Sequence, residues 1–437
     1  MRKMRVIIMG AGGRDMHNFT TYYRDNEHYD VVAFTATQVP FLAGRDVPPE
    51  VAGPNYPGGI HIYDDSELER LIDELNVDEV NFAILDVPHE YVMHQASRVM
   101  VAGPNFMILG ADATMLKSKR PVVAVNAVRT GGGKSPTSRR VCTVLREMGM
   151  NPVVFKHPNP YGDLIDQSFQ RFETYEDLDR HNTCVEEREE YEPHIVNGFT
   201  VFTGIETEKI LRAAEEEGDV IVWDGGNNDL PFLVPDVHIV VTDPHRAGHE
   251  VRYHPGEAGL RRADVIVINK VDTADFEGVE TIRANVRAYN PKATIIEAAS
   301  PIFVDDPAAI AGKQVLVVED GPTLTHGDMA FGAGVVAARR FGAEMVDPRP
   351  YAVGSIKETL EEYTQLEVLL PAMGYSAQQL VDLEQSVNAV PCDLVLVATP
   401  IDLGRMINIE KPSQRVRYET REIGQPNFKD VLSKIAG

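Results

Sequence analysis

The chain has 437 residues and a mass of 48.4 kDa, which corresponds to about three domains at ~150 residues each. Its 43% hydrophobic and 25% charged residues are typical of a globular protein and exclude disordered and fibrous classes, and no apolar run reaches the ~18 residues that span a bilayer. The 66 acidic against 42 basic residues give a net charge of −24, so we expect no nucleic acid as a partner. The basic start is followed by only four apolar residues before Gly10, too few for a signal peptide, so we expect a cytoplasmic protein without a membrane partner.

The first ~115 residues alternate between short apolar strands and helices. The helix predicted at 67–75 carries Leu68, Leu71, Ile72 and Leu75 at the i, i+3, i+4, i+7 spacing of one helical face. Apolar strands are predicted at 5–9, 31–35, 80–85 and 106–109. Because near-continuous apolar strands alternate with helices, the pattern predicts a parallel, doubly wound sheet.

A second α/β unit is predicted to follow, with strands at 121–125, 152–155, 219–223, 237–242, 264–268, 294–297 and 314–318. The stretch 172–191, with its acidic run 186–190, predicts an exposed helical insertion. After residue 350, a helix at 376–388 and a strand at 394–398 are expected. The predicted fold class is therefore α/β: a Rossmann-like domain (1–118), a P-loop NTPase domain (119–345, insertion about 165–215) and a C-terminal α/β extension (346–437).

The segment Arg129-Thr130-Gly131-Gly132-Gly133-Lys134-Ser135 lies between an apolar strand and a helix, as a phosphate-binding loop does. Its glycines let backbone N–H groups converge on phosphates, and the helix N-terminus adds partial positive charge. Lys134 is predicted to reach the β- and γ-phosphates, and Ser135 to ligate Mg²⁺. A standard P-loop has glycine where Val128 stands. The segment instead resembles the compact loop of deviant P-loop ATPases and GTPases, in which Arg129 would be an extra catalytic cation.

A buried strand at 265–268 runs into Asn269-Lys270-Val271-Asp272, the N-K-x-D pattern with which P-loop GTPases read a base. An aspartate accepts from two guanine N–H donors, whereas adenine offers an acceptor beside one donor on the same edge. Asn269, Lys270 and Asp272 are thus predicted to contact the base, with Ser300 in the loop that closes over it. The residues favour guanine, but ATP and GTP both remain open.

The apolar strand at 220–223 ends in Asp224, the carboxylate expected at a strand tip to hold Mg²⁺ through water and to assist catalysis. The predicted metal residues are Ser135 and Asp224, and the predicted catalytic residues are Lys134, Arg129 and Asp224. Cys142, Cys184 and Cys392 are scattered and odd in number, which indicates reduced thiols better than disulfides or a metal site.

Polar residues at other strand ends are candidates for binding a substrate. Arg14 follows a glycine-rich loop after the first strand, but the second strand lacks the terminal carboxylate that a dinucleotide-binding domain needs for the ribose, which disfavours a dehydrogenase. His157, His245, Arg246 and His326 lie in loops expected at the same carboxyl edge as the P-loop. A cluster of basic and polar side chains at this edge of an otherwise anionic protein suggests a multiply charged anionic substrate.

Six motifs together resemble the cyclic 2,3-diphosphoglycerate synthetase family, over essentially the whole chain: R-T-G-G-G-K-S, K-H-P-N-P-Y-G-D, E-E-R-E-E-Y-E-P-H, D-P-H-R, N-K-V-D and E-D-G-P-T-L-T-H-G. The resemblance implies a ligase that closes an intramolecular phosphoanhydride in 2,3-diphosphoglycerate and releases a nucleoside diphosphate and phosphate. It also implies ATP as the co-substrate, Mg²⁺, and Arg14, His157, His245, Arg246 and His326 as holders of the diphosphoglycerate. A homodimer is expected.

Two other functional classes stay open. A regulatory or metallochaperone-type GTPase would share the P-loop and the base-reading motif, although three separated cysteines weaken a role in metal delivery. A CoA- or acyl-phosphate ligase would use the N-terminal loop and need a phosphorylatable histidine near it, for which His17 and His89 are candidates. Product formation from 2,3-diphosphoglycerate separates the first hypothesis from these two.

Overall fold

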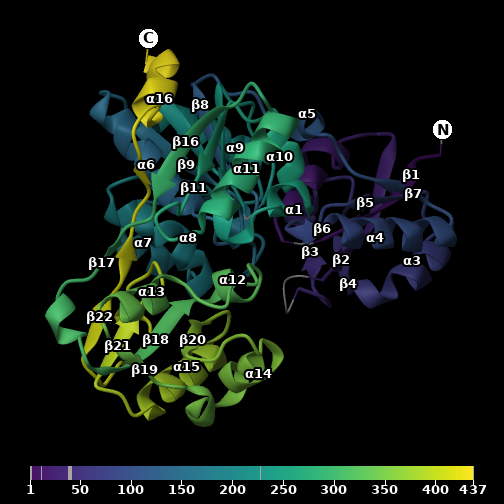
Figure 1. Cartoon of the computed structure of the whole chain (residues 1–437). Helices are drawn as coiled ribbons and strands as arrows, with labels where there is room; N and C mark the ends of the chain where they lie inside the picture. Colours follow the sequence, from purple (N-terminus) through teal and green to yellow (C-terminus); the bar gives the residue numbers. More distant parts are fainter. Residues whose placement is uncertain (1, 11, 38–41, 227, 437) are drawn as a thin grey trace.

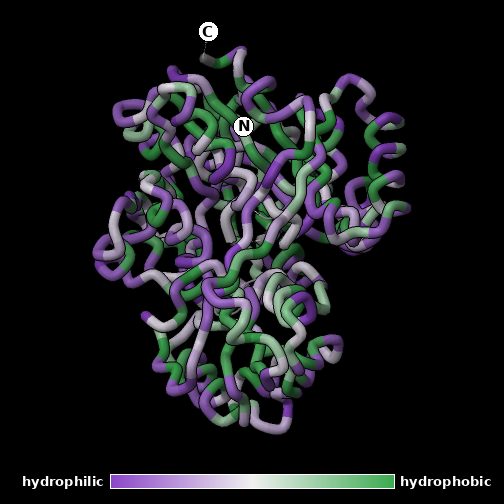
Figure 2. The backbone as a smooth tube through the Cα atoms, turned by 60° about the vertical axis from the view of Figure 1, so that its left-hand side comes forward, coloured by the Kyte–Doolittle hydropathy of each residue, from purple (hydrophilic) through white to green (hydrophobic). Residues whose placement is uncertain are grey.

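The computed structural model describes residues 2–10, 12–37, 42–226 and 228–436, and these form three units, each built on a largely parallel sheet (Figure 1). The predicted α/β fold class is confirmed. Ala11, in the glycine-rich loop after the first strand, lies outside the described residues. Hydrophobic and hydrophilic stretches alternate along the chain in all three units (Figure 2), as short buried strands between partly exposed helices require. No helix of the described residues combines the length and apolarity needed to cross a membrane.

The front unit has the strand order β3-β4-β2-β1-β5-β7, and only the β3–β4 pair is antiparallel. Alternate residues of β1 pack on opposite faces: Val6 and Ile8 against α1 and the turn after it, and Ile7 and Met9 against α3 and α4. The sheet is therefore covered on both sides, as the apolar strands predicted. The elements are β1 Met4–Met9, α1 Arg14–Asn18, β2 Tyr29–Ala36, β3 Asp46–Val47, α2 Pro49–Ala52, β4 Ile60–Asp64, α3 Leu68–Glu74, β5 Glu79–Phe82, β6 Val87–Pro88, α4 His89–Ala102, β7 Asn105–Met107 and α5 Ala111–Thr114.

The middle unit carries a nine-stranded sheet in the order β10-β11-β9-β12-β8-β13-β15-β16-β24, antiparallel only at its two edges. Its central strand β8 leads directly into the P-loop and α6. The terminal helix α16 returns to pack on α6 with Phe428 and Leu432 (Figure 1). The elements are β8 Val122–Ala127, α6 Lys134–Glu147, β9 Pro152–Lys156, β10 Gln170–Phe172, α7 Tyr175–Arg180, α8 Val185–Val196, β11 Val201–Thr203, α9 Thr207–Glu217, β12 Val220–Asp224, β13 Val237–Thr242, α10 Gly256–Arg262, β15 Val265–Ile268, α11 Phe276–Tyr289, β16 Thr294–Ala299, β24 Arg421–Glu422 and α16 Phe428–Ala436.

The third unit is a parallel sheet of five strands, and its central strand corrects one prediction. The strand expected at 314–318 in the middle sheet is β18, which pairs with β19, β20 and β21 of the third unit. The strand follows the middle sheet in sequence, but its partners come later in the chain, which local patterning cannot show. The elements are β18 Gln314–Asp320, α12 Gly321–Leu324, α13 Ala333–Arg340, β19 Glu344–Met345, α14 Gly354–Glu362, β20 Leu369–Ala372, α15 Ala377–Ala389, β21 Leu394–Val397 and β22 Ser413–Arg415.

The acidic helix α8 is buried, which corrects the prediction of an exposed insertion. Tyr191 and Ile195 pack in the core beneath the middle sheet, while Val185 joins the core of the third unit. Its carboxylates accept hydrogen bonds from the third unit: Glu186 from the Gly374 amide at 2.8 Å and Glu189 from the Thr399 hydroxyl at 2.6 Å. The helix is thus a joint between two units, and its charges face polar partners instead of solvent.

Two short ribbons also join units that are distant in sequence. β6 of the front unit pairs with β14 (Tyr253–His254) of the middle unit, in antiparallel register. β17 (Ile302–Phe303) pairs with β23 (Arg417–Tyr418), so the C-terminal segment runs back along the middle unit. Both ribbons lie beside the carboxyl ends of the middle sheet, where the candidate site is found.

Candidate active site

The P-loop spans the six residues between the end of β8 and the start of α6. Gly131 and Gly133 have φ of 75° and 102°, in the left-handed region that favours glycine. A Cβ atom on Gly133 would lie 2.0 Å from the Asn269 amide nitrogen, so the close approach of these two segments requires a glycine here. The loop and the helix N-terminus have the form that binds phosphates.

Asp224, at the end of β12, is fully buried and surrounded by donors. Its Oδ1 lies 2.8 Å from Lys134 Nζ and 3.0 Å from the Ser138 hydroxyl, and its Oδ2 lies 3.0 Å from Lys156 Nζ and 2.8 Å from His194 Nε2. Burial alone would raise the pKa of Asp224, but Lys134, Lys156 and the His194 hydrogen bond hold this pKa well below its usual value. Asp224 therefore holds the two lysines at the P-loop as a charged group.

The predicted magnesium residues differ in how they fit a metal ion. The Ser135 hydroxyl is half-buried on the wall of the cavity beside the P-loop, where oxygen ligands suit Mg²⁺. Both oxygens of Asp224 are occupied by side-chain partners, so Asp224 does not fit as a direct ligand in this arrangement. Within the described ranges, no group of three or more histidine, cysteine, aspartate or glutamate side chains is placed to hold a metal ion. The cysteines in these ranges are unpaired, as the sequence predicted.

The N-K-V-D segment has two separate contacts at the site. Asn269 and Lys270 support the P-loop, with Asn269 Nδ2 donating to the Gly132 carbonyl at 3.0 Å and Lys270 Nζ to the Gly131 carbonyl at 2.6 Å. Asp272 lies further along, where its Oδ1 accepts the Ser300 amide at 2.8 Å and the side chain remains exposed. The segment therefore joins the P-loop to Ser300; Lys270 and Ser300 line the cavity beside the P-loop, whereas Asp272 is not among its lining residues, so its contact with a base stays a prediction.

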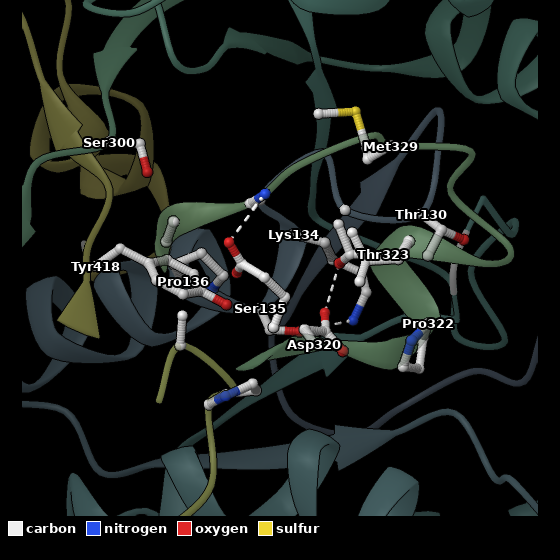
Figure 3. A pocket seen from close by; sticks show the side chains of 18 of the residues that line it. Thr130, Lys134, Ser135, Pro136, Ser300, Asp320, Pro322, Thr323, Met329 and Tyr418 are labelled. Carbon is white, nitrogen blue, oxygen red and sulfur yellow. Dashed lines mark hydrogen bonds between the residues drawn. The ribbon is translucent and has the colours of Figure 1, made fainter. Parts of the chain in front are cut away.

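The cavity beside these segments, which we call the P-loop cavity, is elongated. Figure 3 shows Ser300 and Tyr418 toward one end and Thr130 and Pro322 toward the other, with Lys134 and Ser135 between them. A nucleotide whose phosphates occupy the P-loop would have its base at the end with Ser300. Its terminal phosphate would then point toward the end with Thr130.

A second cavity, which we call the front cavity, opens beyond that end. It is lined by the front-unit loop at Gly12 and Gly13, by the loop after β9, and by residues of α8 and the third unit. Thr130, Glu186, Glu190 and Pro322 line both cavities, so the two adjoin at the end where a terminal phosphate would lie. The two cavities are therefore in direct contact beside the P-loop.

The predicted substrate residues do not all converge. Arg14 and His157 line the front cavity, but both are paired with the buried Asp229, at 2.6 Å from the Arg14 guanidinium and 2.9 Å from His157 Nδ1. His326 lines the front cavity, and His245 lines the P-loop cavity.

Arg246 and Arg129 are engaged elsewhere. Arg246 binds Asp243 at 2.8 Å and the Gly327 carbonyl at 2.6 Å, so it joins two loops. Arg129, predicted to stabilise developing charge, is 1% exposed and stacks over the Tyr253 ring at 3.9 Å. Its Nε lies 2.9 Å from Asp86, and its guanidinium also binds Asp328. The side chain thus connects the P-loop to the front unit.

Three side chains at the candidate site lie in motifs that the sequence analysis quotes but were given no role of their own. Lys156, at the end of β9, contacts both Asp224 and Glu190. Its place at a strand end was a usable signal, because the carboxyl edge of an α/β sheet carries the site. Glu190 and His194 lie on α8 within the E-E-R-E-E-Y-E-P-H motif, but the run of charges resembles a solvated helix, so no role was predicted for them.

Comparison with known proteins assigns the chain to a family. It is 58% identical over 436 residues to "Arginine synthetase ArcE" of Thermococcus kodakarensis, covering 100% of this chain and 97% of that protein. The chain belongs to the ArcE family. It is thus a member of a synthetase family, with a P-loop at its site.

The other matches are weaker. The cyclic 2,3-diphosphoglycerate synthetase of Pyrococcus furiosus is 28% identical over 98 residues, 22% of each chain, so the resemblance expected over the whole chain extends over part of it only. No family model matches the chain. Among solved structures, LpxK of Aquifex aeolicus, crystallised in complex with ATP, covers 85% of this chain and all of its own, with 12% identity and a TM-score of 0.45.

Proposed function

We propose that this ArcE-family protein is a synthetase that uses a nucleoside triphosphate, ATP or GTP, to form arginine. The observation that carries the proposal is the contact between the two cavities at Thr130, Glu186, Glu190 and Pro322, beside the P-loop lysine. A terminal phosphate and an acceptor can meet there without crossing solvent. The full-length similarity to an arginine synthetase supports arginine as the product.

The chemistry of the product defines the reaction class. The guanidino carbon of arginine carries three nitrogens, and phosphoryl transfer makes an oxygen a leaving group. The precursor therefore carries an oxygen on that carbon, which makes it a ureido amino acid, citrulline. The ureido oxygen attacks the γ-phosphorus and the nucleoside diphosphate leaves. Ammonia then attacks the carbon, the C–O bond breaks, and phosphate leaves with the oxygen while the ammonia nitrogen loses a proton.

In this scheme the chain mainly positions and stabilises charge. The amides of the P-loop and Lys134 hold the phosphates, and Lys156 remains on Asp224 when Lys134 turns to the nucleotide. Mg²⁺, when bound with the nucleotide, would neutralise phosphate charge, and the Ser135 hydroxyl is the group that would hold it. The front unit covers the acceptor and limits access of water to the activated precursor.

The charges of the front cavity favour an amino acid over a diphosphate. Its lining includes Asp15, Glu186 and Glu190, of which Glu190 is paired with Lys134 and Lys156, while Arg14 and His157 on the same wall are already paired with Asp229. Burial raises the pKa of Asp15 to about 6 and of Glu186 to about 7, so Glu186 is about half ionised at pH 7 and fully ionised only above it. For Glu190 the effect of burial is outweighed by Lys134 and Lys156, which lower its pKa. Carboxylates next to the acceptor would repel 2,3-diphosphoglycerate but would attract the ammonium and guanidinium groups of the arginine reaction.

The proposal is tested by product analysis. Purified protein is incubated with Mg²⁺, ATP or GTP, citrulline and ammonium, and arginine and nucleoside diphosphate are quantified by mass spectrometry. We expect the two products in equal amounts and no nucleotide consumption without citrulline. Nucleotide hydrolysis that neither citrulline nor ammonium affects would overturn the proposal and favour a regulatory GTPase.

The second candidate is cyclic 2,3-diphosphoglycerate synthesis with 2,3-diphosphoglycerate as substrate, which the partial match to the Pyrococcus protein favours. A parallel reaction with 2,3-diphosphoglycerate in place of citrulline and ammonium, followed by ³¹P NMR, distinguishes it. The arginine proposal expects no cyclic anhydride resonance in that reaction. A cyclic product without any arginine in the first reaction would establish the second candidate.

A further inference from the structure

Glu186 is a buried carboxyl group with one oxygen left free toward the junction of the two cavities. The side chain is 3% exposed, and its Oε1 accepts the Gly374 amide at 2.8 Å. Its Oε2 has no oxygen or nitrogen hydrogen-bond partner among the described residues; the Cys184 thiol, a weak donor, is close enough to lower the pKa of this carboxyl group, and the residue lines both cavities. An unpaired buried carboxyl oxygen is costly, which indicates a partner that is supplied by a ligand.

Two tyrosine rings stand beside this carboxyl group on the wall of the front cavity. Tyr161 and Tyr375 pack edge to face with their centroids 5.3 Å apart, and both line the cavity with Glu186. Burial, followed by the charges of nearby acidic groups that include Glu186, raises the pKa of each tyrosine well above its usual value. Neutral aromatic rings next to a carboxylate form an environment that favours a cation.

Glu190 lies one helical turn along α8 and completes the acidic side of the junction. Its Oε2 is 3.6 Å from Lys134 Nζ and also contacts Lys156, so this carboxylate faces the terminal phosphate position. Glu186 has no comparable lysine partner among its contacts in the described chain. Of the two, Glu186 is the carboxylate available to a ligand in the front cavity.

We propose that Glu186, beside the Tyr161 and Tyr375 pair, forms a subsite for a positively charged nitrogen group: the ammonium ion in synthesis and the guanidinium of arginine in the product complex. The inference rests on the proposed function and adds the group that recognises the nitrogen substrate. It places the nitrogen at the junction, next to the carbon whose oxygen receives the phosphoryl group. Glu186 would contact the ammonium nitrogen directly and accept the proton that ammonium loses before ammonia attacks the carbon.

The test replaces Glu186 with glutamine, which retains the size and the carbonyl-type oxygen for the Gly374 amide but removes the negative charge. We expect the Glu186→Gln variant to have a KM for ammonium at least about ten-fold higher, with the KM for the nucleotide unchanged. Hydroxylamine, which is uncharged at pH 7.5, should serve as nucleophile nearly as well for the variant as for the wild type. Calorimetry with arginine and nucleoside diphosphate should show binding at least about ten-fold weaker to the variant.

Glu187→Gln is the matched control, because Glu187 is the adjacent residue of α8 and equally buried but lines neither cavity. Burial raises its pKa to about 7, as it does for Glu186, so the two variants change the same kind of group. We expect Glu187→Gln to keep ammonium and arginine affinities within about two-fold of the wild type. Thermal melting of both variants checks that each is folded.

The outcomes separate the inference from the function on which it rests. If the wild type forms arginine and Glu186→Gln has unchanged affinities for ammonium and arginine, the subsite is wrong and the proposed function stands. An equal loss with hydroxylamine and ammonium would also overturn it, because charge recognition predicts a loss for the cation alone. If the wild type neither forms nor binds arginine, both proposals fall.

Discussion

The Asp86 carboxylate of the front unit lies 2.9 Å from Nε of Arg129, the first residue of the P-loop segment. The same carboxylate accepts the Thr130 amide at 3.1 Å and the Thr130 hydroxyl at 2.6 Å. Asp86 adopts a left-handed backbone with φ of 56°, which turns the chain after β5 toward the middle unit. A single buried carboxylate therefore ties the front unit to the P-loop.

We predict that Asp86→Asn destabilises the protein and weakens nucleotide binding together. The change leaves the Arg129 guanidinium, 1% exposed, without its buried charged partner, and breaking such a pair costs about 3–5 kcal/mol. We expect a lower free energy of unfolding in urea and a KM for the nucleotide raised about ten-fold. Equilibrium unfolding and initial-rate kinetics measure the two effects.

Asp328→Asn is the control for this prediction, because it removes the other carboxylate that binds Arg129. Its side chain is 64% exposed, so the pair contributes about 0–1 kcal/mol. We expect little change in stability or in KM. Equal effects of the two variants would contradict the role that we assign to Asp86.

Lys134→Ala should abolish turnover while the fold stays intact. Lys134 is the P-loop lysine, and the loss of a cation that stabilises a transferring phosphoryl group costs at least ~10²-fold in kcat. Asp224 keeps Lys156, Ser138 and His194 as partners in this variant, so we expect an unchanged circular dichroism spectrum. A variant with full activity would show that the nucleotide phosphates bind elsewhere.

Asp272→Ala should lower the preference for GTP over ATP. The exposed carboxylate of Asp272, which accepts the Ser300 amide, is the group that the N-K-V-D pattern predicts to accept from guanine, and a hydrogen bond to a charged group contributes about 1.5–3 kcal/mol. We predict that the ratio of kcat/KM for GTP to that for ATP falls at least about ten-fold, whichever nucleotide the wild type prefers. An unchanged ratio would show that the base lies away from Asp272.

Glu186→Gln should become more stable relative to the wild type as pH rises. Burial raises the pKa of Glu186 from 4.5 to about 7, so the folded wild type binds this proton more tightly than the unfolded chain does. Its contribution to stability is fully present below pH 4.5 and is lost as pH rises through 7. Glutamine does not titrate.

The stability of Glu186→Gln must be compared with that of the wild type at each pH, because other titrating groups change the stability of both proteins in the opposite direction. Burial lowers the pKa of His238, His249 and His254 to about 4, and these histidines stabilise the fold as pH rises from 4 to 6.5. They contribute equally to both proteins. We expect the difference in unfolding free energy to shift toward the variant by about 1–3 kcal/mol between pH 5 and pH 8. A shift of opposite sign would contradict the assigned pKa.

The sequence could predict those parts of the site that are carried by local patterns. The P-loop and the N-K-V-D segment each follow an apolar strand, and strand ends of a parallel sheet meet at one edge. The partner of Arg129 could not be predicted, because Asp86 lies 43 positions away in another unit and its role depends on how the units pack. The prediction that the acidic run 186–190 is exposed was wrong, because solvated and buried charged helices can have the same composition. The residues that cover it, Gly374 and Thr399, belong to the third unit and lie far away in the sequence.

The most direct test of the central claim follows the ureido oxygen. Citrulline labelled with ¹⁸O at the ureido position is incubated with the protein, ammonium, Mg²⁺ and nucleoside triphosphate, and phosphate and arginine are analysed by mass spectrometry. The account predicts one labelled oxygen in the phosphate for each arginine formed, because the oxygen that accepts the phosphoryl group leaves with it. Unlabelled phosphate, or phosphate released without arginine, would contradict the account.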